Sequence, residues 1–97
     1  MGIFAITYTY DTERSEDIAR LRPTHREFLT GLNAEGQLLA SGPWAENAAP
    51  GALLIVAAED ATAAQLLLDD DPFYRARLIT QRTVRAWQPV LGPFAEQ

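Results

Sequence analysis

The stretch IFAITYTY, residues 3–10, decides the fold of this chain of 97 residues. It is rich in β-branched and aromatic residues and is followed by Asp11, a pattern typical of a β-strand that ends at a turn. One face of this strand carries Phe4, Ile6, Tyr8 and Tyr10, and the other carries Ile3, Ala5, Thr7 and Thr9. Because neither face has a charge, we expect both sides of the strand to be covered.

Outward from this strand, apolar periodicity and turn residues predict two main helices and three further strands. The charged segment 11–22 is either a loop or a short helix. The main first helix begins near Arg22 or Pro23, since proline suits the first helical position, and Gly36 ends it as the C′ residue. The remaining elements are strands at 37–43 and 52–58, a helix at 61–70 capped by Asp60, a short helix at 72–78 and a last strand at 82–90.

The order β-α-β-β-α-β is that of a ferredoxin-like α+β sandwich, in which two helices cover one face of a four-stranded antiparallel sheet. We expect a single domain over residues 1–97, because a chain of this length builds one modest core. Two helices cover only one side of such a sheet, whereas the strand at 3–10 is apolar on both. A second copy of the chain, packed sheet to sheet in a homodimer, would supply the second cover and form a dimeric α+β barrel.

The composition argues against several classes of protein. The formal charge is -5, and the eight basic residues, all arginines, form no basic stripe, so we expect no nucleic-acid binding. No apolar stretch approaches the roughly 20 residues of a membrane span, and the first residues lack the basic start of a signal peptide, so a cytoplasmic protein is the default expectation. Cysteine is absent, the single histidine has no metal-ligand spacing, and the glycines form no phosphate loop. We therefore expect neither a metal nor a cofactor.

Residues 65–78, QLLLDDDPFYRARL, place three aspartates at the end of a predicted helix, where the helix dipole disfavours carboxylates. Asp71, before Pro72, is a good N-cap for the next helix, and this role is compatible with a catalytic one. The other two aspartates are then solvated residues of a tight corner. His25 lies in RPTHREFL, in the first turn of the predicted helix, where the positive helix end favours the neutral imidazole that a general base needs. The alternative is an ordinary surface or half-buried histidine.

The segment SGPW, at the end of a predicted strand, is a third candidate. Ser41 is a candidate hydroxyl at a pocket mouth, Gly42 permits close approach of the backbone, and Trp44 is a candidate apolar wall. The alternative is an ordinary strand end and turn. No G-x-S-x-G elbow surrounds Ser41, so it is not predicted to be a hydrolase nucleophile. Arg85, in the last strand, either pairs with a carboxylate, clamps an anionic substrate or lies exposed on an edge strand.

The segments RPTHREFL, EGQLLASGP, DDDPFYRA and VRAWQPV occur in an order and at separations that resemble the YciI-like family, over residues 3–90. The resemblance implies a ferredoxin-like domain that dimerises through its sheets, and a cleft with a His–Asp pair that falls on His25 and Asp71. The candidate substrate contacts are Arg22, Ser41, Trp44 and Phe73. A few members resemble dehydrochlorinases of chlorinated hydroxyquinol-type aromatics, and related dimeric folds serve as muconolactone isomerases and cofactor-free monooxygenases. Segments 11–21 and 44–51 depart from the family, so the substrate is not carried over.

The leading hypothesis is a small cofactor-independent enzyme of the lyase or isomerase type. In it, His25 moves a proton on a small cyclic or aromatic substrate, and Asp71 orients the imidazole. One competing hypothesis is a non-catalytic dimeric module that binds a small ligand or serves as an accessory to a larger enzyme. Another is a monooxygenase of the antibiotic-biosynthesis type on a similar scaffold. A short His25–Asp71 distance would favour the first hypothesis over the second.

Overall fold

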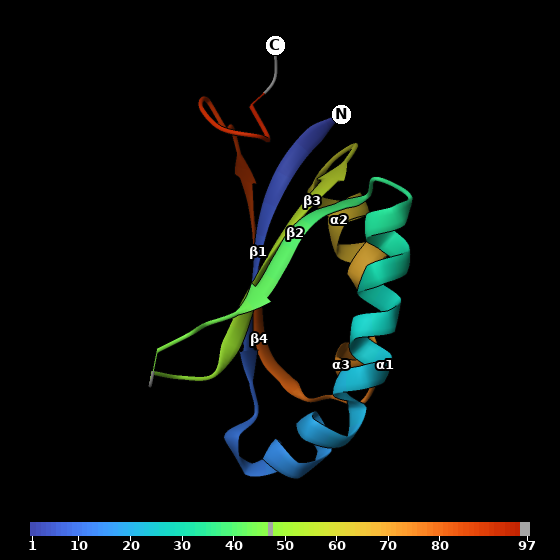
Figure 1. Ribbon diagram of the computed structural model, residues 1–97, viewed down its shortest axis with the longest axis vertical. Coiled ribbons are helices and arrows are strands. Elements are labelled where there is room, and N and C mark those ends of the chain that lie inside the picture. Colours follow the sequence, from blue (N-terminus) through green and yellow to red (C-terminus); the bar gives the residue numbers. More distant parts are fainter. Residues whose placement is uncertain (47, 96–97) are drawn as a thin grey trace.

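The computed structural model describes residues 1–46 and 48–95, and its main elements follow the predicted order. They are β1 (Gly2–Tyr10), the 3₁₀ helix η1 (Thr12–Arg14), α1 (Ser15–Ala34), β2 (Leu38–Pro43), β3 (Gly51–Ala58), α2 (Ala61–Leu68), α3 (Pro72–Arg75) and β4 (Ile79–Trp87) (Figure 1). The strand pairs are antiparallel and the strand order is β2-β3-β1-β4. The fold is therefore the predicted ferredoxin-like α+β sandwich.

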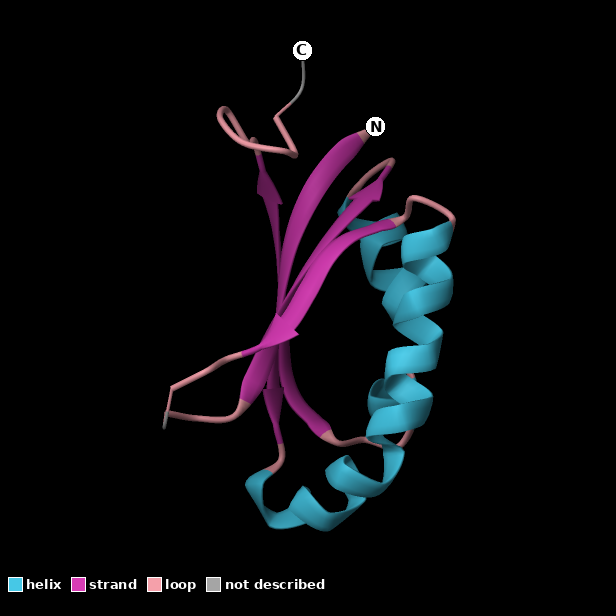
Figure 2. Cartoon of the chain, viewed as in Figure 1, coloured by secondary structure: helices cyan, strands magenta, loops and turns pink. Residues whose placement is uncertain are grey.

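The helices lie together on one face of the sheet, as Figure 2 shows. The register sets which side chains share that face, and Tyr8 of β1 lies opposite Ala52 of β3 and Arg82 of β4. The core fills the space between this face and the helices. Its buried members include Phe4, Ile6, Tyr8, Tyr10, Leu29, Leu54, Val56, Leu68, Phe73 and Leu78. The helix-facing side of β1 is thus the face with Phe4, Ile6, Tyr8 and Tyr10, a choice that the sequence alone left open.

The opposite face of the sheet is not covered by any described part of the chain. The alternate residues of β1, namely Ile3, Ala5, Thr7 and Thr9, are only half-buried. Leu53 and Ala57 of β3, which pair with Thr7 and Ile3, are also half-buried. The expected second cover, another copy of the chain, stays a prediction.

The predicted start of the first helix near Arg22 or Pro23 is wrong, because α1 begins at Ser15. Acidic residues occupy its first turn, where they suit the positive helix end, and ion pairs between neighbouring turns support the helix. The pairs are Arg14–Asp17 and Arg20–Asp17. These local charges, together with the buried side chain of Ile18, favour a helix in a segment whose sequence left loop and helix open.

Pro23 therefore lies inside α1, where it cannot donate to the carbonyl four residues earlier. In Figure 1, α1 first crosses the end of the sheet and then turns to run along it, and a proline is a common cause of such a bend. His25 consequently lies in the middle of the helix. The expected influence of the helix end on its imidazole does not apply, because that effect fades within the first turn.

The other element ends follow from local turns. Gly36, with φ of 78°, follows the last residues of α1 as predicted. The helix α3 ends earlier than predicted, because Arg77, with φ of 59°, turns the chain. The strand β4 begins at Ile79, three residues earlier than predicted, because Ile79 already pairs with Tyr10, and it ends at Trp87, before the predicted end at Val90. Gly51 is required by packing, since a Cβ there would lie 2.0 Å from the backbone oxygen of Tyr8.

Among the described helices, none has the length and apolar character that a membrane crossing requires.

Candidate active site

Asp71 lies at the N-cap of α3 and is fully buried, with 0% of its surface exposed. Its Oδ1 accepts a hydrogen bond of 2.9 Å from the backbone N–H of Phe73, and Pro72 occupies the start of the helix, as expected for this cap. A buried carboxylate needs further donors, because an uncompensated charge in the core is costly. Those donors come from α1 and β1.

The first donor is His25, whose Nδ1 lies 2.8 Å from Asp71 Oδ1. The middle of α1 packs across α3 and so brings the imidazole to a carboxylate 46 residues later in the chain. The ring is also stacked on Phe73, with centroids 3.9 Å apart and 3° between the planes. His25 is therefore buried and doubly fixed. With a carboxylate on Nδ1, that nitrogen donates and Nε2 carries the lone pair.

The second donor is Tyr8, whose hydroxyl donates to Asp71 Oδ2 at 2.9 Å. Burial raises the pKa of Tyr8 well above its ordinary value, and the negative charge of Asp71 raises it further, so the hydroxyl keeps its proton and remains a donor. Sequence reasoning placed Tyr8 on the buried face of β1 but did not assign it to the site. The available signal was that a buried tyrosine hydroxyl usually needs a partner.

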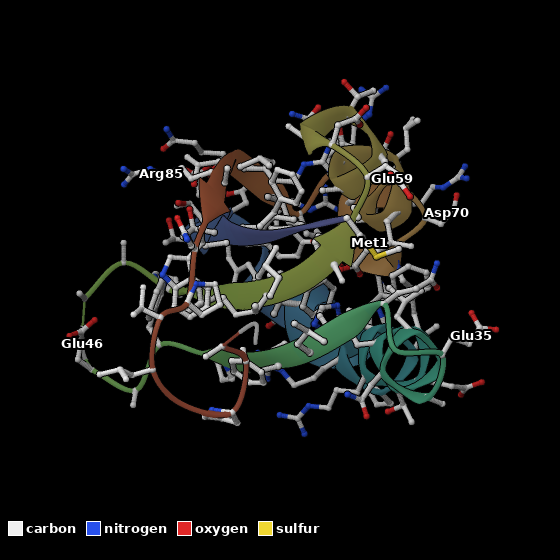
Figure 3. The ribbon with its side chains drawn as sticks, turned by 90° about the horizontal axis from the view of Figure 1, so that it is seen from above. Met1, Glu35, Glu46, Glu59, Asp70 and Arg85 are labelled. Carbon is white, nitrogen blue, oxygen red and sulfur yellow. The ribbon has the colours of Figure 1, made fainter. Side chains whose placement is uncertain are left out.

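The three consecutive aspartates have three different partners. Asp70 is exposed, pairs with Arg75 and points away from the molecule in Figure 3. Asp69 was expected to be solvated, but its Oδ1 lies 2.7 Å from Nη2 of Arg82 on β4, which also stacks over the ring of Tyr74 at 4.0 Å. Asp71 accepts from the backbone, the imidazole and the phenol. Each of the three adjacent carboxylates thus has its own hydrogen-bond or ion-pair partners, which offset the repulsion between them.

Arg85, the arginine of β4 that sequence reasoning considered, has no ion pair within the described residues. It pairs in register with Ala5, on the face of the sheet away from the helices, and Figure 3 shows its side chain on that side. It therefore does not reach the aspartates. Arg82 is the arginine that does, because its register position places it beside Tyr8 on the helix-facing side.

A cavity of about 190 Å³ opens beside His25. It lies between α1 and the ends of β2 and β3, and its lining is mostly apolar. The lining residues are His25, Arg26, Leu29, Ser41, Gly42, Pro43, Ala52 and Leu54. Because Nδ1 is engaged by Asp71 and the ring borders the cavity, Nε2 is the nitrogen available to a molecule bound there.

The predicted substrate contacts lie in different places. Ser41 borders the cavity together with His25, whereas Trp44, 42% exposed, borders a separate hollow of about 250 Å³ that also includes Leu53. Phe73 is fully buried behind the imidazole. Arg22 lies on α1, one turn before Arg26, and is not among the described residues that line the cavity. The roles of these four residues as substrate contacts stay predictions.

No group of three or more metal-ligating side chains occurs within residues 1–46 and 48–95.

Comparison with known proteins assigns the chain to a family. The YCII-related domain matches residues 3–88 of the chain. The chain belongs to this family. A search of curated proteins finds no significant match to this YCII-related chain.

Two solved structures share the fold of this YCII-related protein. One is 5-chloro-2-hydroxyhydroquinone dehydrochlorinase (TftG) from Burkholderia phenoliruptrix AC1100, in complex with 2,5-dihydroxybenzoquinone. Its TM-score is 0.78 and its sequence identity 22%, and the match covers 89% of this chain and 93% of that one. The other is an antibiotic biosynthesis monooxygenase, with a TM-score of 0.57, 16% identity and coverage of 94% and 100%. At these identities the similarity shows the fold alone.

Proposed function

We propose that this protein is a small enzyme of the lyase or isomerase type, in which His25 is the general base and Asp71 orients it. The observation that carries the proposal is the buried hydrogen bond of 2.8 Å between the two side chains, at the edge of a cavity. A histidine held by a buried carboxylate has one defined tautomer and a stabilised imidazolium form, which are the properties of a general base.

The proposed step is the removal of a proton from a bound organic molecule by Nε2. In an elimination, the electron pair of the broken C–H or O–H bond forms a new double bond, and a leaving group such as chloride departs with its own bonding pair. In an isomerisation, the imidazolium returns the proton to another carbon. The carboxylate of Asp71 stabilises the positive charge of the imidazolium. Neither reaction requires a redox group, so we propose that the enzyme is independent of a cofactor.

The substrate that we propose is a small ring compound, with chlorinated hydroxyhydroquinones as the first class to test. The dehydrochlorinase that shares the fold acts, by its name, on such a compound. The volume of the cavity, about 190 Å³, also suits a single substituted ring, since an engineered cavity of about 150 Å³ binds benzene. The apolar walls would exclude water from the reacting carbon.

The test is turnover of a panel of halogenated hydroxyhydroquinones and ring lactones that begins with 5-chloro-2-hydroxyhydroquinone. Turnover is measured by chloride release and by absorbance. For any substrate that is converted, His25→Ala should lower kcat by about 10²–10⁴-fold, because that is the usual contribution of a general base. Thr24→Ala, at the exposed neighbouring position on α1, is the matched control and should keep the parental rate. If His25→Ala folds and turns over the substrate at the parental rate, the assignment is wrong.

We also propose that the protein forms a homodimer through the uncovered face of the sheet. The half-buried apolar side chains of Ile3, Leu53 and Ala57 on this face support the proposal. Leu53→Glu should shift the protein to a monomer in analytical ultracentrifugation, because it would bury a charge in the interface. Gln65→Glu adds the same charge on the exposed side of α2 and should leave the assembly unchanged. A monomeric parent protein at micromolar concentration would contradict the proposal.

A further inference from the structure

Two arginines of α1 lie close to the candidate site without an ion pair. The chain is acidic, with a formal charge of -5 and 13 acidic residues for 8 basic ones. Four arginines take part in ion pairs within the described residues, namely Arg14, Arg20, Arg75 and Arg82. Arg22 and Arg26, which flank His25 on α1, have no such pair there. Apart from the carboxylate of Asp71, which is bound to His25 Nδ1, the charged side chains that flank the imidazole on α1 are thus two arginines without an ion pair among the described residues.

Arg26 borders the His25 cavity directly. Apart from His25 and Ser41, its neighbours in the cavity lining include Leu29, Pro43 and Leu54, which offer no charge. Charge–charge attraction is stronger beside apolar walls than in open water, since less water screens it. Arg26 is itself exposed, but the apolar residues beside it keep water from one side of its guanidinium, so an anionic oxygen bound in the cavity would be less screened from this charge than one bound to an arginine surrounded by water.

The positive charges of Arg22 and Arg26 also act on Tyr10, which packs against the ring on which His25 is stacked. Burial raises the pKa of Tyr10, and the positive charges of Arg22 and Arg26 act against that increase. Tyr10 packs edge to face on Phe73, the ring on which His25 is stacked. The two guanidinium groups thus act on the same region of the protein as the proposed base, Arg26 at the cavity and Arg22 one turn away.

We infer that the cavity binds its substrate as an anion, with the guanidinium of Arg26 on a phenolate, enolate or carboxylate oxygen and His25 Nε2 on the proton to be moved. This inference rests on the proposed function and narrows it to acidic substrates. Arg26 is then a specificity residue. It also supports the proton transfer, because negative charge that develops on a conjugated oxygen when the base removes a proton falls next to a fixed cation.

The test is binding, which is independent of turnover. We would titrate the protein by calorimetry with 2,5-dihydroxybenzoquinone, an acidic hydroxyquinone that is ionised at neutral pH, and with hydroquinone, a similar ring that is neutral there. Three proteins are compared, namely the parent, Arg26→Gln and Arg20→Gln. Arg20 is the matched control, since it lies on the same helix, carries the same charge and pairs with Asp17 at the surface.

We expect the parent to prefer the anionic probe, and Arg26→Gln to weaken its binding by about tenfold or more, which is the scale of one lost charge-assisted hydrogen bond. Arg20→Gln should change it by less than about twofold, because surface charges are screened. Neither substitution should change the affinity for the neutral probe, hydroquinone. Equal affinities of Arg26→Gln and the parent, or a parent that does not prefer the anion, would overturn the inference. Turnover by His25→Ala at the parental rate would instead overturn the proposed function. The preference for the anionic probe, which is measured by binding, would be unaffected by that result.

Discussion

Replacing Tyr8 by Phe tests whether the hydrogen bond from Tyr8 to the buried carboxylate of Asp71 stabilises the fold. The change removes one hydroxyl and keeps the aromatic ring, so the packing of the core is conserved. It leaves Asp71 Oδ2 without its donor. Water cannot take over, because Tyr8 is 1% and Asp71 0% exposed. The variant therefore isolates the contribution of a single hydrogen bond to a buried carboxylate.

Hydrogen bonds to charged groups contribute about 1.5–3 kcal/mol. We expect the free energy of unfolding of Tyr8→Phe to fall by about 2 kcal/mol, which corresponds to a decrease in Tm of about 10 °C for a domain of this size. Urea and thermal unfolding followed by circular dichroism measure both quantities. Tyr10→Phe is the matched control, since Tyr10 is a second buried phenol on the same face of β1 but does not donate to any described carboxylate. Its expected loss is within about 0.5 kcal/mol.

If the two variants unfold at the same temperature, the Tyr8–Asp71 bond contributes nothing to stability, and our inference about the buried carboxylate is refuted.

Three further predictions concern the residues around this hydrogen bond. Asp71→Asn should lower kcat by about 10²-fold or more, because an amide no longer fixes the tautomer of His25 or stabilises its cation; a parental kcat on the same substrate would contradict this. Gly51→Ala should cost about 1–3 kcal/mol in urea unfolding, because its Cβ would overlap the Tyr8 carbonyl, and an unchanged midpoint would show that the strands separate freely. Burial raises the pKa of Tyr8, so this phenol keeps its proton in the folded protein at a pH where it ionises in the unfolded chain. The free energy of unfolding should therefore be constant below the ordinary tyrosine pKa of about 10 and should fall as the pH rises above that value. Tyrosinate absorbance should therefore show this residue ionising only together with unfolding, and ionisation in a protein that remains folded would argue against the buried phenol.

The fold was predictable because its signals are local and mutually consistent. The uncharged strand at residues 3–10, the continuous apolar run of β3 and the Asp60 and Asp71 caps each specify an element over a few residues, and together they fix the order β-α-β-β-α-β. The start of α1 was not predictable in the same way. Pro23 is favourable at a helix start and tolerated at a bend, and only the packing of Ile18 and the ion pairs upstream of it decide between the two.

The candidate site was predictable only in part. His25 and Asp71 were singled out because each combines a reactive side chain with a recognisable local motif. Tyr8 and Arg82 have no such motif, since their partners depend on the register between β1 and β4 and on how α3 packs over that pair of strands. The same dependence explains why Asp69 was expected in solvent and is instead held by an arginine of β4. Contacts of this kind follow from the assembled sheet, which a single strand does not encode.

The stacking of the imidazole on Phe73 also has a stereochemical meaning. With its ring plane and Nδ1 both fixed, His25 offers one nitrogen from one wall of the cavity. A proton that this nitrogen takes from a flat bound ring and later delivers to a neighbouring carbon stays on the same side of that ring. Isomerisation would then be suprafacial, and a product with a new stereocentre would form as a single enantiomer.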